Sequence, residues 1–211
     1  MKLTIFGATG TTGTTITAQA LAAGHDVTAV VRDASRLTIP DHPRLRVVTA
    51  DVMDPTSISQ AVEDADAVIS ALGPRGTGPT TVIRDSVHSI ISAMDKTGSR
   101  RFVEVSGSIV ADEGESLYMR YLVKPLARRT FLRHVCADMR AGENEIRGSD
   151  LDWTIVRPPS LNDKQATGSY RTAIDQNLPH GFSVSRADLA AFMLALVDDP
   201  ASVHRHVAIA N

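Results

Sequence analysis

The sequence predicts a single α/β domain, built on a doubly wound, mostly parallel β-sheet with helices on both faces. Short aliphatic runs alternate with amphipathic helical stretches along the chain, which is the pattern of strand–helix–strand crossovers. Hydrophobic residues make up 43% of the 211 residues but aromatic residues only 4%, a composition typical of strands that are buried on both faces. A glycine-rich turn also separates the first apolar run from the first helical stretch. We therefore expect one domain over residues 1–211.

Regular alternation is clearest in the first half of the chain. The apolar run at 3–6 predicts a strand, and the spacing of apolar residues over 11–23 predicts a helix that Gly24 ends. Asp54 is a suitable cap for a short helix over 55–63. The other elements expected here are strands at 26–31, 45–49, 67–70 and 101–105 and a long helix at 80–97.

The second half has looser stretches between its regular elements. Residues 106–124 contain glycines, acids and tyrosines, and they predict a long loop. Residues 158–181 are expected to be irregular, with one short strand at 168–171. The remaining predictions are a helix over 126–148, a strand at 153–157, a helix that Ser185 opens and that ends at 197, and a strand at 207–210.

The turn at 7–13 carries the strongest functional signal. In a turn between strand and helix, one glycine permits the tight bend, another lets backbone approach a pyrophosphate, and a third lets the helix pack on the strand. The helix N-terminus then directs free N–H groups at the phosphates. An ordinary glycine-rich turn is the alternative, but the position between strand and helix predicts a Rossmann-type fold that binds a dinucleotide. The expected cofactor residues here are Gly7, Thr9, Gly10, Thr11, Thr12 and Gly13.

The end of the second strand indicates which dinucleotide is bound. Arg32 follows this strand directly, and an arginine here would pair with the 2′-phosphate of NADP(H). Arg36 adds either a second cation for that phosphate or a solvated surface charge. Asp33 could instead bind the ribose hydroxyls, which keeps NAD(H) possible. NADP(H) is the expected cofactor.

Two later strand ends extend the expected cofactor site. Asp51 and Val52 follow the third strand, where Asp51 could accept the adenine amino group or could be a turn residue. Ala71, Leu72 and Gly73 follow the fourth strand, where small residues let the backbone lie along the ribose and pyrophosphate. Because open parallel sheets bind ligands beyond the carboxyl ends of their strands, we expect the loops 107–125 and 158–184 to form the substrate side.

Taken together, these residues resemble the atypical short-chain dehydrogenases/reductases with an NmrA-like NAD(P)-binding domain, and within them the flavin reductase (biliverdin reductase B) group. The resemblance spans nearly the whole chain. It rests on GATGTTG at 7–13, VVRD at 30–33, VSGS at 105–108, LDWTIVRPPSL at 151–161, TGSYR at 167–171 and RADLAAFML at 186–194.

The resemblance implies hydride transfer from NADPH to a small conjugated acceptor such as a flavin, a tetrapyrrole or a quinone. It implies that Ser106 lies near the nicotinamide, where it could orient substrate or donate a hydrogen bond, or simply end its strand. It places Arg157, Pro158 and Pro159 beside the nicotinamide, and Ser108, Tyr121, Lys124 and Tyr170 as substrate-binding candidates, although Tyr170 could be structural. The alternative function is a non-catalytic NmrA-like NAD(P)-binding redox sensor or regulator.

One departure from typical short-chain dehydrogenases limits the reaction. Those enzymes place a lysine four residues after a catalytic tyrosine, whereas Tyr118 and Tyr121 precede Lys124 at other spacings. Alcohol oxidation by that pair is therefore not expected. The basic, apolar stretch from Arg120 to Arg133 predicts either a solvated helix face with a buried stripe or a flap that attracts an anionic substrate.

Composition argues against several other classes of protein. The net charge of −2 gives no footprint for nucleic acid or for an anionic membrane, and no apolar run is long enough to span one. Cys136 is the single cysteine, expected on a helix facing the core or a partner, and the seven histidines form no ligand-spaced cluster, so no metal site is expected. Since a strand begins at the N-terminus, without a signal peptide, we expect a cytoplasmic protein. The expected oligomeric state is a monomer or a weak homodimer.

Overall fold

The computed structural model describes residues 1–111, 113–114, 121, 124–130 and 132–211. Its main sheet has eight strands in the order β3-β2-β1-β4-β5-β6-β10-β8, and β7 and β9 form a separate parallel pair. The strands are β1 Lys2–Phe6, β2 Asp26–Val31, β3 Leu45–Thr49, β4 Ala67–Ser70, β5 Arg101–Val105, β6 Asp152–Arg157, β7 Ser160–Asn162, β8 Arg171–Ile174, β9 Ser183–Ser185 and β10 Arg205–Ala210. The helices are α1 Thr11–Ala22, α2 Pro55–Val62, α3 Val82–Thr97, α4 Lys124–Arg129, α5 Arg133–Arg147 and α6 Arg186–Val197, and short 3₁₀ turns lie at Ala34–Arg36, Ser108–Val110 and Pro200–Ser202.

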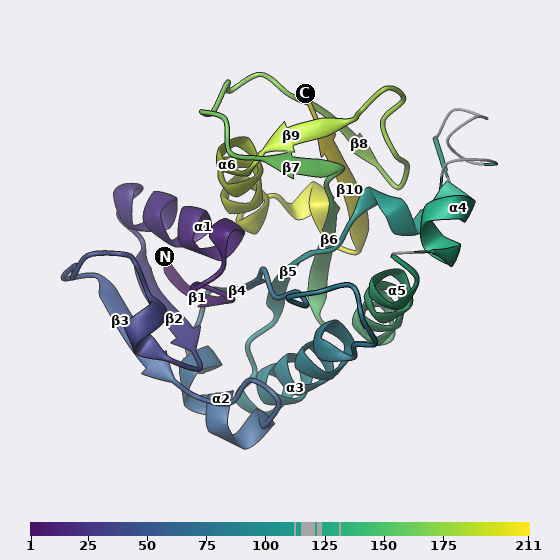
Figure 1. Cartoon of the computed structure of the whole chain (residues 1–211). Coiled ribbons are helices and arrows are strands. Elements are labelled where there is room, and N and C mark those ends of the chain that lie inside the picture. The colour runs from purple at the N-terminus through teal and green to yellow at the C-terminus, as the bar shows by residue number, and fades with distance from the viewer. Residues whose placement is uncertain (112, 115–120, 122–123, 131) are drawn as a thin grey trace.

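Helices cover both faces of this sheet, as expected for a doubly wound fold (Figure 1). Helices α1 and α6 pack together on one face, and α2, α3 and α5 pack side by side on the other. A hydrophobic core lies on each side. One includes Ile5 and Leu189, and the other includes Phe102 and Ile90. The single Rossmann-type α/β domain predicted from the sequence is therefore confirmed.

Strand pairing in the sheet is parallel except at one edge. Strand β10 runs parallel to β6, but β8 pairs antiparallel with β10, with Val207 opposite Ile174. The carboxyl ends of β1, β2, β4, β5 and β6 meet at one edge of the sheet, which we call the carboxyl edge.

Several helix ends are held by side chains. Asp54 accepts a hydrogen bond from the Thr56 N–H and so caps α2, and the Ser185 hydroxyl accepts from the Asp188 N–H at the start of α6. These two caps confirm the helix starts expected at those positions. The start of α3 is capped differently, because the buried carboxylate of Asp138 on α5 accepts hydrogen bonds from the Ile83 and Arg84 N–H groups.

Two expectations for the second half of the chain were wrong. The helix expected over 126–148 is divided into α4 and α5, and Thr130 lies between them. The Thr130 hydroxyl donates to the Leu126 carbonyl, a type of bond that competes with continued helix. The stretch 158–181 is also more regular than expected, because β7 lies within it and β8 occupies 171–174 rather than 168–171.

No helix in the described ranges is long and apolar enough to cross a membrane. Cys136 is buried on α5, as expected for a helix residue facing the core.

Candidate active site

The glycine turn brings the first strand, the first helix and the end of β4 into close contact. Gly7 has a φ of +82°, and a Cβ there would lie 2.7 Å from the Ala71 carbonyl oxygen. A Cβ on Gly13 would lie 2.1 Å from the Gly7 carbonyl oxygen, which no side chain tolerates. Gly7 therefore makes the tight turn, and Gly13 allows the helix to pack on it.

The N-terminus of α1 is open. Gly10 is its N-cap residue, with φ −88° and ψ 158°, and no side chain caps the helix. The first-turn N–H groups of Thr11, Thr12 and Gly13 have no partner within the helix, and the helix dipole adds partial positive charge there. This turn fits a pyrophosphate.

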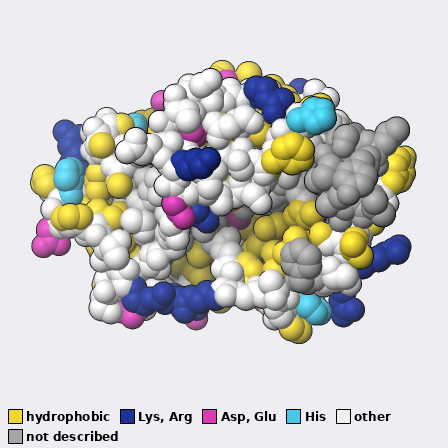
Figure 2. Space-filling view, turned by 45° about the horizontal axis from the view of Figure 1, so that its top comes forward, with side chains coloured by type: hydrophobic (Ala, Val, Ile, Leu, Met, Phe, Trp, Pro, Cys, Tyr) yellow, Lys and Arg dark blue, Asp and Glu magenta, His cyan; other side chains and the backbone are white. Residues whose placement is uncertain are grey.

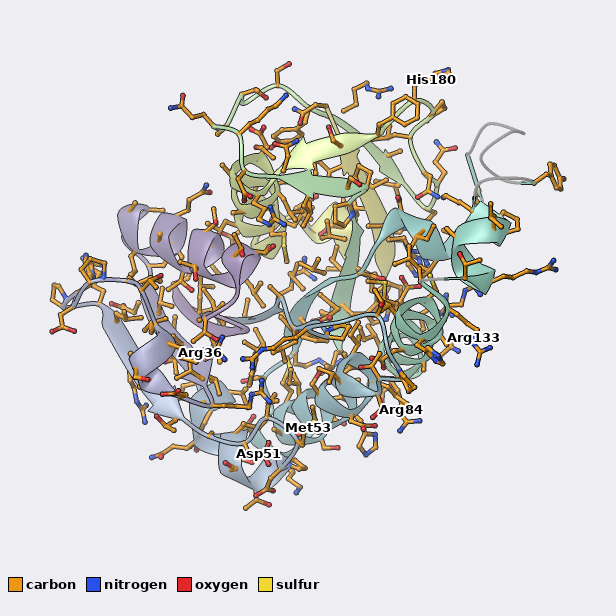
Figure 3. The ribbon with its side chains drawn as sticks, in the orientation of Figure 1. Arg36, Asp51, Met53, Arg84, Arg133 and His180 are labelled. Atoms are coloured by element: carbon orange, nitrogen blue, oxygen red, sulfur yellow. The ribbon has the colours of Figure 1, made fainter. Side chains whose placement is uncertain are left out.

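Three arginines surround a cavity of about 230 Å³ beside this turn. It is lined by Thr9, Arg32, Asp33, Arg36 and Arg75. Arg36 comes from the 3₁₀ turn that follows β2 (Figure 3). Arg75 lies in the loop after β4, so the cations come from two different strand ends. All three arginine side chains are exposed, so they can contact a ligand.

Asp33 lies in the same cavity, but its carboxylate already has partners. It accepts hydrogen bonds from the Ser35 N–H at 3.0 Å and from the Ser35 hydroxyl at 2.7 Å, and so caps the 3₁₀ turn. The hydroxyl and N–H of Ser35 lower the pKa of Asp33, and the charge of Arg36 adds to that effect. Asp33 is therefore an anion that positions the turn carrying Arg36.

The other expected cofactor residues lie in turns, in the core or beside the glycine turn. Asp51 accepts from the Met53 N–H at 3.0 Å, which makes it a turn residue beside α2 (Figure 3). The Val52 side chain is buried in the core on the α2 side. Ala71 and Leu72 lie against Gly7, whereas Gly73 has open space around it.

A larger, mostly apolar cavity of about 480 Å³ lies further along the carboxyl edge, after β5 and β6. Figure 2 shows this face of the molecule hollowed, with hydrophobic side chains on the floor of the hollow. The polar lining comes from Ser106, Ser108, Ser160 and Lys124, and the apolar lining from Ile109, Leu132, Val135, Cys136, Met139, Pro158, Pro159, Leu161 and Phe182, with Gly107 and Gly181 between them. We call it the apolar cavity. Its composition suits a flat hydrophobic molecule.

Ser106 belongs to a buried hydrogen-bond network at the end of the apolar cavity. Its hydroxyl donates to Glu143 Oε1 at 2.7 Å. Arg157 Nε donates to the same oxygen at 3.0 Å, and Arg157 Nη2 donates to Glu143 Oε2 at 2.5 Å. Arg157, whose backbone is expected beside the nicotinamide, thus directs its guanidinium toward α5. The carbonyl of Pro158 accepts from the Ser108 N–H.

Lys124 is buried and holds the turn that follows Ser106. Its Nζ donates to the carbonyls of Ser108 and Ala111, at 2.7 and 2.9 Å. Asn177 Nδ2 donates hydrogen bonds to the same two carbonyls. Lys124 therefore shapes the wall of the apolar cavity.

The structure does not bring the two tyrosine candidates into that cavity. Tyr121 is 68% exposed. Tyr170 packs edge-on against Phe192 of α6, with ring centroids 5.5 Å apart, in the core on the α1 side. Tyr118 lies outside the described residues, as does Arg120 of the basic stretch. Arg133, at the other end of that stretch, lies on the outer side of α5 (Figure 3).

Glu104 is a buried acid close to the site that the motifs do not indicate. It lies on β5, two residues before Ser106, and is 2% exposed. Burial raises its pKa well above the usual range, and the nearby charge of Glu143 adds to the rise. Burial therefore favours the protonated form of Glu104 more than it would be favoured in a solvated glutamate.

Sequence comparison gives the family directly. Residues 7–200 match the model of a family described as NAD(P)H-binding. An uncharacterised chloroplastic protein of Arabidopsis thaliana is 34% identical over 200 residues, covering 90% of this chain and 69% of that protein. The chain belongs to the NAD(P)H-binding family. It is thus an NAD(P)H-binding protein, as the glycine turn predicts.

Solved structures agree with this assignment. The anaerobilin reductase ChuY of Escherichia coli O157:H7 has a TM-score of 0.79 and 26% identity, covering 100% of this chain and 97% of that one. A short-chain dehydrogenase/reductase of Veillonella parvula in complex with NADP has a TM-score of 0.83 and 21% identity, covering 100% and 94%. The similarity to the Veillonella parvula protein shows a shared fold.

Sequence reasoning did not single out two residues that line or support these cavities, Arg75 and Glu143. Arg75 follows the fourth strand at the same edge as Arg32, so the topology could have indicated it. Glu143 had no comparable signal, because nothing in the helical pattern of 126–148 distinguishes a buried acid from a solvated one. Among the described residues no group of three His, Cys, Asp or Glu side chains is arranged to hold a metal ion.

Proposed function

We propose that this protein is an NADPH-dependent reductase that transfers hydride to a small conjugated acceptor, a flavin, tetrapyrrole or quinone. The observation that carries the proposal is the pairing of two sites along the carboxyl edge. An arginine-lined cavity lies beside the dinucleotide turn, and the apolar cavity lies after the next strands of the same sheet.

The arginine cavity supports NADPH over NADH. Arg32, Arg36 and Arg75 can each donate hydrogen bonds to a phosphate, and guanidinium groups match phosphate geometry well. Asp33, the residue that would favour NADH by binding ribose hydroxyls, already accepts two hydrogen bonds from Ser35. The cavity thus provides more hydrogen-bond donors for a 2′-phosphate than acceptors for free ribose hydroxyls.

The apolar cavity supports a conjugated acceptor. Hydrophobic and aliphatic side chains form most of its lining, and flat aromatic molecules gain affinity from such burial. The bound cofactor supplies a hydride, and the acceptor takes up that hydride together with one proton from water. The residues of this chain orient the acceptor. The related anaerobilin reductase favours a tetrapyrrole among the candidates.

The direct test is oxidation of NADPH followed at 340 nm with riboflavin, FMN, biliverdin and a quinone as separate acceptors. We expect turnover with at least one of them, and slower turnover when NADH replaces NADPH. Tight NADPH binding without turnover on any acceptor would contradict the reductase and favour a redox sensor that signals to a partner.

A further inference from the structure

The hydroxyl of Ser106 has its hydrogen-bond direction set by two buried neighbours. Ser106, Glu143 and Arg157 are only 7%, 3% and 9% exposed. Glu143 Oε1 accepts from both Ser106 Oγ and Arg157 Nε, and Glu143 Oε2 accepts from Arg157 Nη2. Ser106 also lines the apolar cavity.

The chemistry of these groups allows one direction for the Ser106 bond. A guanidinium can only donate hydrogen bonds, so Arg157 requires Glu143 to be an acceptor. A carboxylate has no proton to give, so the single O–H of Ser106 must donate to it. The hydroxyl has no second proton, and its remaining capacity toward the apolar cavity is that of an acceptor.

We propose that Ser106 accepts a hydrogen bond from the substrate and thereby selects acceptors that carry a lactam or imide N–H. Flavins and linear tetrapyrroles carry such a group next to their conjugated system. Quinones present only carbonyl oxygens, which would meet the Ser106 oxygen without a proton between them. Glu143 and Arg157 are positioning residues, because they act on the substrate through Ser106. This inference rests on the proposed function for the identity of the cavity.

His206 is a further polar side chain close to Glu143. Its Nε2 lies 3.9 Å from Glu143 Oε2, beyond hydrogen-bond distance. Burial lowers the pKa of His206, and the charge of Arg157 lowers it further. His206 is therefore neutral at neutral pH and leaves the Arg157–Glu143 pair as it is.

The test compares binding of riboflavin with that of 3-methylriboflavin, in which the imide N–H is replaced by a methyl group. Flavin fluorescence gives dissociation constants without turnover, in the presence of NADP⁺, which cannot reduce the flavin. In the unmodified protein we expect riboflavin to bind about tenfold more tightly than the methylated form, as for one lost hydrogen bond.

Ser106→Ala separates hydrogen bonding from steric exclusion of the methyl group. If Ser106 accepts a hydrogen bond from the imide N–H, the variant should bind riboflavin about tenfold more weakly and should bind 3-methylriboflavin with unchanged affinity. The affinity for biliverdin, measured by absorbance, should fall by a similar factor if the tetrapyrrole is bound through its lactam N–H. Unchanged riboflavin affinity with stronger binding of the methylated form would overturn the proposal, as would an effect confined to NADPH affinity.

The double variant Glu143→Leu/Arg157→Met tests the positioning residues. Replacing a buried ion pair by apolar side chains of similar size often preserves stability, and circular dichroism would verify the fold. The Ser106 hydroxyl is then free to donate into the cavity, so menadione should compete with riboflavin about tenfold better than in the unmodified protein. Unchanged competition by menadione in a folded double variant would contradict the positioning role of Glu143 and Arg157. If the double variant does not fold, the result for Ser106→Ala tests the proposal.

These results are distinguishable from failure of the proposed function. Flavin binding that depends on Ser106, without NADPH oxidation, would contradict the reductase but keep the selection by N–H. If neither riboflavin nor biliverdin binds, the selection by N–H is overturned.

Discussion

At the scale of single residues, selectivity for a phosphate depends on exposed cations. Arg32 and Arg75 are exposed, and they line the same cavity as Thr9. Asp33, the acid in that cavity, accepts its two hydrogen bonds from Ser35. A phosphate that enters the cavity therefore meets arginine donors that are available to it.

Arg32→Ala tests this arrangement. We expect the variant to bind NADPH about tenfold to a hundredfold more weakly, since a hydrogen bond to a charged group contributes about 1.5–3 kcal/mol. NADH affinity should change little, because NADH has no 2′-phosphate. Arg46→Ala on β3, another exposed arginine, is the matched control. Equal losses for the two nucleotides would contradict the 2′-phosphate role.

Glu104 predicts a pH dependence of folding stability. Its pKa is raised in the folded protein by burial, so the folded chain retains a proton that the unfolded chain releases above about pH 4.3. Stability contributed at this position is thus present below that pH and is lost as pH rises. Urea unfolding from pH 5 to pH 8 should show a smaller decline for Glu104→Gln than for the unmodified protein. Glu63→Gln, at an exposed glutamate, should not alter the decline; identical slopes for all three would refute the assignment.

Individual residues were predictable where chain position alone determines the role. Arg32 follows a buried strand at the carboxyl edge, so its place in the cavity could be expected. Glu143 and Tyr170 were different, because their roles depend on partners distant in sequence. Glu143 meets Ser106 and Arg157 only after α5 packs against the sheet, and Tyr170 finds Phe192 on α6.

At the scale of elements, the turn between β1 and α1 contains one glycine that the fold requires and another that dinucleotide binding requires. Gly13→Ala should destabilise the protein, because its Cβ would lie 2.1 Å from the Gly7 carbonyl oxygen. Gly10→Val should still fold but with a modest loss of stability, since its φ of −88° is open to any residue, a Cβ there would lie a tight 3.3 Å from the Gly7 carbonyl oxygen, and valine is a poor N-cap residue. Its bulk would nevertheless cover the first-turn N–H groups and remove dinucleotide binding.

Thermal melting and nucleotide titration of both variants measure this contrast. The expected pattern is a strongly lowered melting temperature for Gly13→Ala, and a smaller decrease together with loss of NADPH binding for Gly10→Val. Full NADPH affinity in Gly10→Val would remove the turn from the binding site.

The parallel strands of the main sheet were predictable because they are short aliphatic runs, most of them buried on both faces. The bounds of β2, β3, β4 and β5 agree with the sequence prediction. Strands β7, β8 and β9 carry no such signal. Strand β8, with the sequence RTAI, pairs on one side only and is mostly exposed, so its pattern resembles a loop. The α4–α5 break was hidden for a similar reason, because helical spacing continues across it.

At the scale of the whole molecule, the topology places two different cavities along one edge of one sheet. The arginine cavity belongs to the ends of β1, β2 and β4, and the apolar cavity to the ends of β5 and β6. A dinucleotide that spans from the first to the second would present its nicotinamide to the acceptor. Nucleotide binding should therefore stabilise the fold as a unit, by about 2.7 kcal/mol at a hundredfold excess over the dissociation constant.

Isothermal titration calorimetry of the unmodified, folded protein with NADPH and with NADH measures both nucleotide binding and the preference for the 2′-phosphate. We predict that one NADPH binds per chain, at least tenfold more tightly than NADH, because a phosphate with arginine partners gains more than about 1.4 kcal/mol. Equal affinities would contradict the role of the arginine cavity. Absence of binding heat for both nucleotides at millimolar concentration would contradict the assignment of the glycine turn itself.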